Sequence, residues 1–253
     1  MNTLKIETSG SIAILRLDRG KANAMNAEMV QELAESFTNL ATDPEVKAVV
    51  LSGKDEFFSA GLDVIELYGY DESQILHFWG AFDQLIRLMV SFPKPLVCAV
   101  TGHSPAGGCV LALCCDYRVM ADGKYRIGLN EIPVGIVVPS PIFHLYSFWL
   151  GSARAYQFLL EGLLMTAEKA VEAGLANESC ELAEVELRAI AKASAYVKFN
   201  PVVWSQSKLN FRKNLLEQLS PDFDEAFGPT LKQWWAPETR AQLTAMIEGL
   251  KKK

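Results

Sequence analysis

Hydrophobic and polar positions follow two different periods in the first half of the chain, and each period predicts one type of element. Apolar residues that alternate with polar ones, or that form short continuous runs, predict β-strands. We expect strands at Lys5–Thr8, Ile12–Leu17, Ala48–Ser52, Pro95–Val100 and Tyr117–Met120. Apolar residues at helical spacing predict helices between them, at Ala27–Ala41, Ile75–Phe92 and Gly107–Cys115. This alternation of strands and helices predicts an α/β fold with parallel strands joined by crossover connections.

The pattern becomes mainly helical after Asp116. We expect helices at Ser152–Leu160, Ala167–Ala173, Glu184–Phe199, Pro201–Leu219 and Pro237–Lys252. The segment "SPDFDEAFGPT" (Ser220–Thr230) predicts a loop, because glycine and proline interrupt it. No stretch rich in glycine or serine and no short repeat divides the chain. We therefore expect one continuous architecture rather than domains separated by a linker.

Composition excludes several classes of protein. The chain has 253 residues, 50% of them hydrophobic, which is enough for a sizeable core, and its net charge of −6 argues against a nucleic-acid-binding face. No apolar run reaches the ~18 residues that a membrane span requires. Apolar and polar residues alternate from Leu4 onward, which is typical of strands of the mature fold and not of a targeting sequence. The five cysteines and three histidines lack metal-ligand spacing, so we expect reduced core cysteines, no metal site and a cytoplasmic location.

Two turns of small residues have the same design. "FFSAGLD" (Phe57–Asp63) follows one predicted strand, and "SPAGGCVLAL" (Ser104–Leu113) follows the next and leads into a helix. The carboxyl ends of parallel strands form the edge at which open α/β sheets bind ligands, and a helix N-terminus adds about half a positive charge there. Glycine in either turn alone also fits close packing without any function. The two turns together favour a shared pocket of backbone N–H donors.

Four segments carry a resemblance to a known family. "LDRGKANAMNAEM", "VVLSGKDEFFSAGLD", "KPLVCAVTGHSPAGGCVLALCCDYRVMAD" and "IGLNEIPVGI" resemble the crotonase family, also called the enoyl-CoA hydratase/isomerase family. The resemblance runs from about Leu4 to Asn177. It implies a crotonase-like ββα spiral core that binds acyl-CoA, over residues 1–195, and a helical C-terminal region over 196–253. Relatives are commonly trimers or dimers of trimers, so the resemblance implies that this region serves oligomerisation.

The resemblance also implies roles for individual residues. The N–H groups of Leu62 and Gly107 would form an oxyanion hole for the carbonyl of an acyl-CoA thioester. Removal of a proton beside a thioester leaves an enolate, and one backbone donor to its oxygen is typically worth ~2.7–4 kcal/mol. By analogy, coenzyme A, as part of the substrate, would contact Lys21, Ala22, Ala24, Ser59, Ala60, Leu62 and Gly107. Lys208, with Arg212 one turn later, would contact phosphates of coenzyme A bound to a neighbouring subunit.

One acidic residue is the candidate proton carrier. Family hydratases carry two glutamates, and at these positions this chain has Val110 and Glu131. Hydration must position a water molecule as well as a proton, whereas moving a double bond needs one group that removes and returns a proton. The sequence is therefore most similar to the Δ3,Δ2-enoyl-CoA isomerase branch. This predicts isomerisation of 3-enoyl-CoA to 2-enoyl-CoA thioesters in fatty-acid β-oxidation or related acyl-CoA metabolism, without a prosthetic group.

Other interpretations stay open at this stage. Glu131 can instead cap a turn or pair with Arg126. For Asp63 and Asp116 we expect structural roles, because each follows a glycine turn or a buried helix. Glu66, Asp71 or Glu72 can enter the pocket as a second acid. The rival functions are a hydratase or thioester hydrolase on the same scaffold, and a non-catalytic acyl-CoA binder.

Overall fold

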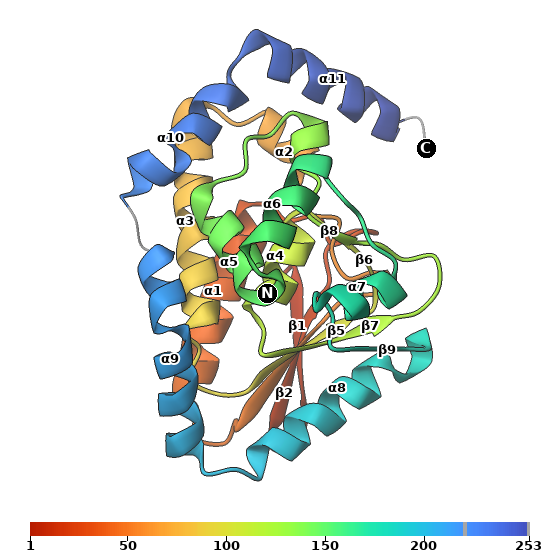
Figure 1. The fold of residues 1–253 in the computed structure, drawn as a ribbon, viewed down its shortest axis with the longest axis vertical. Helices are drawn as coiled ribbons and strands as arrows, with labels where there is room; N and C mark the ends of the chain where they lie inside the picture. Colours follow the sequence, from red (N-terminus) through yellow and green to blue (C-terminus); the bar gives the residue numbers. More distant parts are fainter. Residues whose placement is uncertain (220–221, 252–253) are drawn as a thin grey trace.

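A computed structural model describes residues 1–219 and 222–251, and its centre is a six-stranded sheet. The strand order is β1 (Leu4–Ser9), β2 (Ile12–Leu17), β3 (Ala48–Ser52), β5 (Leu96–Val100), β7 (Tyr117–Ala121) and β9 (Glu178–Cys180). The hairpin of β1 and β2 is antiparallel, and every later pair in this sheet is parallel. The five predicted strands and their parallel crossovers are thus confirmed (Figure 1).

A second, smaller sheet extends from the first. It contains β4 (Glu56–Phe57), β6 (Gly102–Pro105) and β8 (Ile127–Gly128), all parallel. Each of its strands follows a strand of the large sheet along the chain, and a helix comes after each pair. The chain therefore repeats the order strand, strand, helix. Sequence periodicity missed the small sheet because two to four residues are too few to show alternation.

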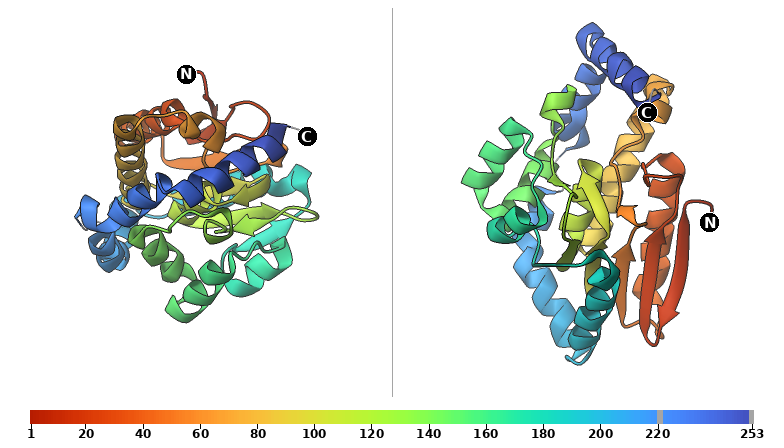
Figure 2. Two further views of the ribbon diagram at one scale, coloured as in Figure 1. Left: turned by 90° about the horizontal axis from the view of Figure 1, so that it is seen from above. Right: turned by 90° about the vertical axis from the view of Figure 1, so that its right-hand side faces the viewer.

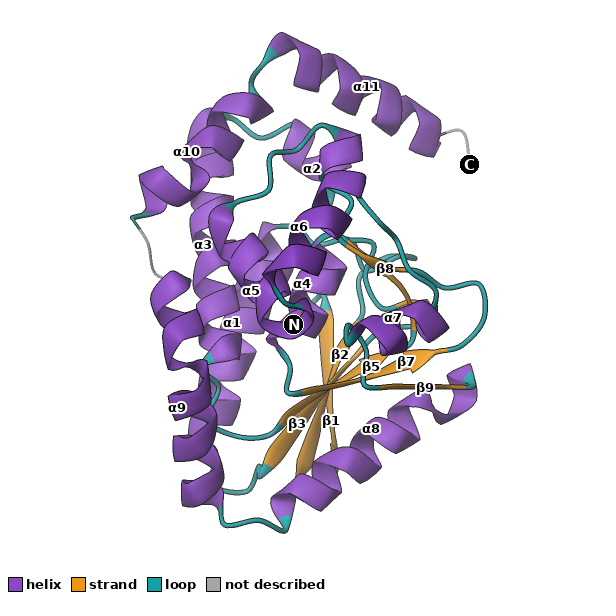
Figure 3. Ribbon diagram, viewed as in Figure 1, coloured by secondary structure: helices purple, strands orange, loops and turns teal. Residues whose placement is uncertain are grey.

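Helices surround the sheets (Figure 3). Helix α1 (Ala27–Thr42) packs against α3 (Glu72–Val90), and α8 (Leu182–Val197) packs along β3, β5 and β7. Helix α4 (Gly107–Cys114) is buried along its whole length, as its apolar sequence predicts. The remaining helices are α2 (Val64–Tyr68), α5 (Ser140–Leu150), α6 (Ser152–Glu161), α7 (Ala167–Ala173), α9 (Pro201–Gln218), α10 (Phe223–Trp234) and α11 (Pro237–Lys251), with the 3₁₀ turn η1 (Ile132–Val134).

The loop predicted at Ser220–Thr230 is wrong over its described part, because α10 begins at Phe223. The Asp222 side chain accepts hydrogen bonds from the N–H groups of Asp224 and Glu225, which caps the helix start. Phe227 and Trp234 are buried, so packing of one face outweighs the helix-breaking tendency of Pro229. Ser220 and Pro221, and Lys252 at the end of the last predicted helix, lie outside the described residues.

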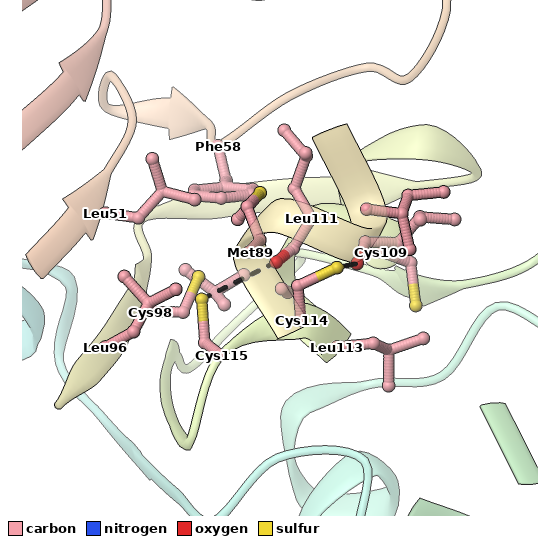
Figure 4. Close-up of a cluster of buried hydrophobic side chains, with 14 of the residues drawn as sticks. Leu51, Phe58, Met89, Leu96, Cys98, Cys109, Leu111, Leu113, Cys114 and Cys115 are labelled. Atoms are coloured by element: carbon pink, nitrogen blue, oxygen red, sulfur yellow. Dashed lines mark hydrogen bonds between the residues drawn. The ribbon is translucent and has the colours of Figure 1, made fainter. Parts of the chain in front are cut away.

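The cysteines lie in the core, as predicted. All five are free and buried. Cys114 and Cys115 donate to the carbonyl oxygens of Val110 and Leu111, and the thiols of Cys98 and Cys115 lie side by side (Figure 4). Burial raises the pKa of the Cys98 thiol well above its ordinary value, which disfavours a reactive thiolate. Cys98 of β5 and Cys115 at the end of α4 therefore serve as small apolar groups where these two elements meet.

Candidate active site

A cavity of about 390 Å³ brings together residues from both small-residue turns. Six of the predicted site residues line it: Ala22, Ala24, Ala60, Leu62, Gly107 and Glu131. Much of the remaining wall is apolar and comes from Trp79 and Phe82 of α3 and from Ile136 and Ile142. Such a cavity suits an acyl chain, because burial of a long hydrocarbon needs apolar surroundings.

The two turns touch each other beside this cavity. A Cβ atom at Gly61 would lie 3.2 Å from the Gly107 nitrogen, and one at Gly107 would lie 3.3 Å from Leu62 Cδ2. Within residues 1–219 and 222–251, the backbone N–H groups of Leu62 and Gly107 donate to no carbonyl oxygen. Ala106, just before α4, has a φ of 49°, a strained value for a residue with a side chain. The chain thus turns sharply to begin α4 against the other turn.

Gly108 is required by close packing rather than by its own dihedral angles. A Cβ atom there would lie 2.5 Å from the carbonyl oxygen of Ser59. Ser59 is itself fully buried, donates from its hydroxyl to the Asn23 carbonyl oxygen and accepts from the Gly61 N–H. The side chain of Ser59 is therefore occupied in holding the turn, and the prediction that it contacts coenzyme A gains no support from its surroundings.

Glu131 is the acidic group of the cavity with the most perturbed environment. Its side chain is 8% exposed, and Oε2 has no hydrogen-bond partner among the described residues. Burial raises its pKa to about 7, an effect that the residue's own backbone N–H offsets only in part. Glu131 precedes η1 but does not cap it, and Arg126 donates to the carbonyl oxygens of Lys124 and Tyr125 instead. Neither structural interpretation of Glu131 applies.

The position of the missing second glutamate faces the same cavity. Val110 is fully buried in the first turns of α4 and lines the wall together with Glu131. An apolar side chain therefore lines the cavity at the position where the sequence resemblance implies an acid in the family hydratases.

The other candidate acids have partners or face solvent. Asp63 caps α2 by accepting from the Glu66 N–H and pairs with Arg19 at 2.7 Å. Glu66 pairs with the same arginine at 2.7 Å, and Asp71 caps α3 in a capping box. Glu72 is exposed. The structural role expected for Asp63 is confirmed, and these four carboxylates leave Glu131 as the unpaired acid of the cavity lining.

The structure corrects the role predicted for Lys208. Its ammonium group is buried and pairs with Asp116 at 2.8 Å, while Arg212 pairs with the same carboxylate at 3.1 Å. Arg212 also donates to the carbonyl oxygens of Cys114 and Cys115, at the C-terminal end of α4. Both cations are therefore occupied by the interior of their own chain and do not present a free positive surface for phosphate. Lys21, by contrast, is exposed beside the cavity-lining Ala22.

Two contributors to the site were not recognised from the sequence. Asn130 lines the cavity beside Glu131, and its Oδ1 atom is buried without a partner among the described residues. Met246 reaches the cavity from α11, more than 100 positions after Glu131. No local pattern marks Met246, because only the folded path of the chain brings it to the site.

The described residues contain neither a cluster suited to a metal ion nor a helix suited to span a membrane. They contain no cluster of three or more histidine, cysteine, aspartate or glutamate residues suited to hold a metal ion. In the same part of the chain, every helix is too short or too polar to cross a bilayer.

Comparison with known proteins identifies the family of this chain. Residues 7–226 match the family model described as enoyl-CoA hydratase/isomerase. Mouse mitochondrial enoyl-CoA delta isomerase 1 is 37% identical over 177 residues, which cover 68% of this chain and 61% of the relative. A probable enoyl-CoA hydratase of Bacillus subtilis (strain 168) is 29% identical over 205 residues, covering 79% of this chain and 78% of the relative.

The structural comparison covers more of the chain. The crystal structure of human mitochondrial delta3-delta2-enoyl-CoA isomerase superposes with a TM-score of 0.95 at 26% identity, over 99% of both chains. The predicted crotonase-like fold is thereby confirmed, including the helical C-terminal region. The chain spans only about 60% of the length of the mouse and rat isomerases that it matches in sequence. On these findings, the chain belongs to the enoyl-CoA hydratase/isomerase family.

Proposed function

We propose that this protein isomerises 3-enoyl-CoA to 2-enoyl-CoA thioesters, in fatty-acid β-oxidation or related acyl-CoA metabolism. The observation that carries the proposal is the pairing of Glu131 with Val110 in one apolar cavity. A single buried carboxylate can move a proton between two carbons. The cavity has Val110 in place of the second carboxylate with which family hydratases position water.

The proposed reaction moves one proton and one double bond. Ionised Glu131 removes a proton from C2 of the 3-enoyl thioester, and the electron pair of that C–H bond moves into the carbonyl group. The Leu62 and Gly107 N–H groups hold the resulting enolate oxygen. Protonated Glu131 then returns the proton to C4, where the C3=C4 π pair forms the new C4–H bond. The C1=C2 pair of the enolate becomes the C2=C3 bond, and a lone pair of the enolate oxygen restores the carbonyl. A pKa of about 7 suits this role, because both protonation states are accessible near neutral pH.

The coenzyme A portion would enter along the loop of Lys21, Ala22 and Ala24 and along Ala60 of the adjacent turn, whose N–H donates to the Ala22 carbonyl oxygen. Three of these residues line the cavity, and Lys21 offers an exposed positive charge beside it. The thioester itself makes the C2 proton acidic, so the proposed reaction requires no prosthetic group.

The decisive experiment follows proton exchange. Incubated with a 3-enoyl-CoA in heavy water, the wild-type protein should form the conjugated 2-enoyl product and incorporate deuterium at C2 or C4. Glu131→Gln should do neither. Conversion of a 2-enoyl-CoA to a 3-hydroxyacyl product instead would favour a hydratase, a class that the name of the Bacillus relative suggests. Binding of acyl-CoA without exchange would indicate a non-catalytic binder.

We also propose that residues 196–253 assemble the chain into a homotrimer or a dimer of trimers. Large apolar side chains are exposed where α8 meets α9 and along α9: Phe199, Val202, Val203 and Phe211. Such a surface is typical of contacts between proteins. Light scattering should give three or six copies, and Phe211→Asp should yield smaller species. A cytoplasmic location stays a prediction, to be tested by cell fractionation, because the mouse relative is named mitochondrial.

A further inference from the structure

The carboxylate of Glu131 depends on its backbone for its position. Oε2 has no hydrogen-bond partner among the described residues, so no side-chain contact fixes that oxygen. The backbone turn that follows is closed by two hydrogen bonds, from the N–H groups of Val134 and Ile136 to the Glu131 carbonyl oxygen, at 3.1 and 2.9 Å. Gly135 completes the turn in the left-handed conformation, with a φ of 82°. Contacts that fix the turn after Glu131 therefore also fix the position of the Glu131 carboxylate.

Helix α11 contacts this turn directly. Gln242 Nε2 donates to the Pro133 carbonyl oxygen at 2.9 Å. The amide of Gln242 also covers Gly135 so closely that a Cβ atom there would lie 2.4 Å from Oε1. Gln242 itself is exposed, so its substitution leaves the core intact.

The same helix contacts the element that follows the other turn. Arg240 donates to the Tyr68 carbonyl oxygen at 2.9 Å and lies 3.5 Å from the centre of the Tyr68 ring. The Tyr68 hydroxyl and Thr244 Oγ1 form a hydrogen bond of 2.9 Å. Tyr68 ends α2, which begins directly after Leu62 and Asp63. Helix α11 is therefore attached to both sides of the cavity.

Helix α11 also closes part of the cavity. Its Met246 side chain lines the cavity, and its Leu243 and Ile247 side chains are buried. The helix crosses one end of the molecule above α2, as Figures 1 and 2 show.

We propose that α11 is a positioning element for the Glu131 base, with Gln242 and Arg240 as its positioning residues. The two contacts fix the distance between the carboxylate and the N–H groups of Leu62 and Gly107. The catalytic consequence rests on the proposed isomerase function. The effect on the carboxylate does not, because the turn holds Glu131 out of water whatever the substrate is.

The test compares Gln242→Met with Glu248→Met. Met keeps the length of glutamine and removes the donor, while Glu248 is an exposed position on the same helix. We expect Gln242→Met to lower kcat by about tenfold, which corresponds to one net hydrogen bond, with KM changed less than about twofold. The acid limb of the pH profile should move to lower pH, since a looser turn admits water and water favours the ionised carboxylate. Glu248→Met should change neither quantity.

A second measurement does not depend on turnover. Carbon-13 NMR of glutamate-labelled protein, with the Glu131 signal assigned by its loss in Glu131→Gln, gives the pKa directly. We expect a lower pKa in Gln242→Met, and also in Thr244→Val, which removes one of the hydrogen bonds between α11 and α2. An unchanged pKa, or a change in KM alone, would overturn the proposal. If the wild type lacks isomerase activity, the proposed function fails while the pKa comparison still decides this inference.

Discussion

Glu131→Gln should make the protein more stable in alkaline solution while abolishing its chemistry. Burial raises the pKa of Glu131 from 4.5 to about 7, so between these values the folded protein keeps a proton that the unfolded chain has lost. Because the unfolded state then binds fewer protons, stability falls as pH rises through this range. At roughly 1.4 kcal/mol per pH unit, the full cost above pH 8 is about 3 kcal/mol.

Glutamine is neutral at every pH in this range, so the stability of Glu131→Gln does not include this pH-dependent loss. At pH 5 the unfolded glutamate is already partly ionised, so about 1 kcal/mol of the cost is present there. The unfolding free energy of Glu131→Gln relative to wild type should therefore rise by about 2–3 kcal/mol from pH 5 to pH 8. Any fixed cost of burying the amide cancels in this difference.

Urea denaturation followed by circular dichroism measures the effect at both pH values. Glu248→Gln, at an exposed position, supplies the control and should show no such trend. A difference between the two pH values below about 0.5 kcal/mol, close to the error of extrapolation, would refute a buried, unpaired carboxylate at position 131. The same pKa predicts that kcat/KM declines below about pH 7, because the base must be ionised to accept a proton.

Three further substitutions test the surroundings of the cavity. Asp116→Ala should destabilise the protein by about 3–5 kcal/mol in thermal or urea unfolding, since it leaves two buried cations without a counter-charge. Removal of the exposed Glu56–Lys124 pair should have a far smaller effect, because solvent screens it. Gly108→Ala should lower both stability and kcat, because its Cβ atom would meet a backbone oxygen at 2.5 Å; wild-type values for both would contradict the packing described. Val110→Glu should slow isomerisation and introduce measurable hydration of 2-enoyl-CoA, and hydration absent from a folded variant would show that a second carboxylate is insufficient.

The large sheet was accessible from the sequence because its strands are long enough to show a pattern. The strands β2, β3, β5 and β7 contain nearly continuous apolar residues that are buried in the structure. The three short strands of the small sheet carry no such signal, although they lead the chain to the cavity. The helix α10 was missed because burial of Phe227 and Trp234 outweighs its glycine and proline.

The site was predictable to the extent that it depends on backbone chemistry. Glycine turns after successive strands indicated where unpaired N–H groups would lie, and Leu62 and Gly107 do line one cavity. The burial of Glu131 among apolar neighbours was also readable. Side chains that reach the cavity from distant helices, such as Trp79 and Met246, were not, because their approach depends on tertiary packing. Lys208 failed for the same reason, since sequence spacing cannot distinguish an exposed lysine from one buried against Asp116.

Both ends of helix α4 take part in specific contacts. Its first residue, Gly107, contributes to the cavity, and the carbonyl oxygens at and just after its last turn accept hydrogen bonds from Arg212. With eight residues, α4 acts as a spacer of fixed length. One inserted or deleted residue would rotate one end by about 100° relative to the other. A change in the residue count of α4 would therefore displace either Gly107 at the cavity or the carbonyl oxygens that Arg212 binds, whereas a change of side chain would leave both ends in place.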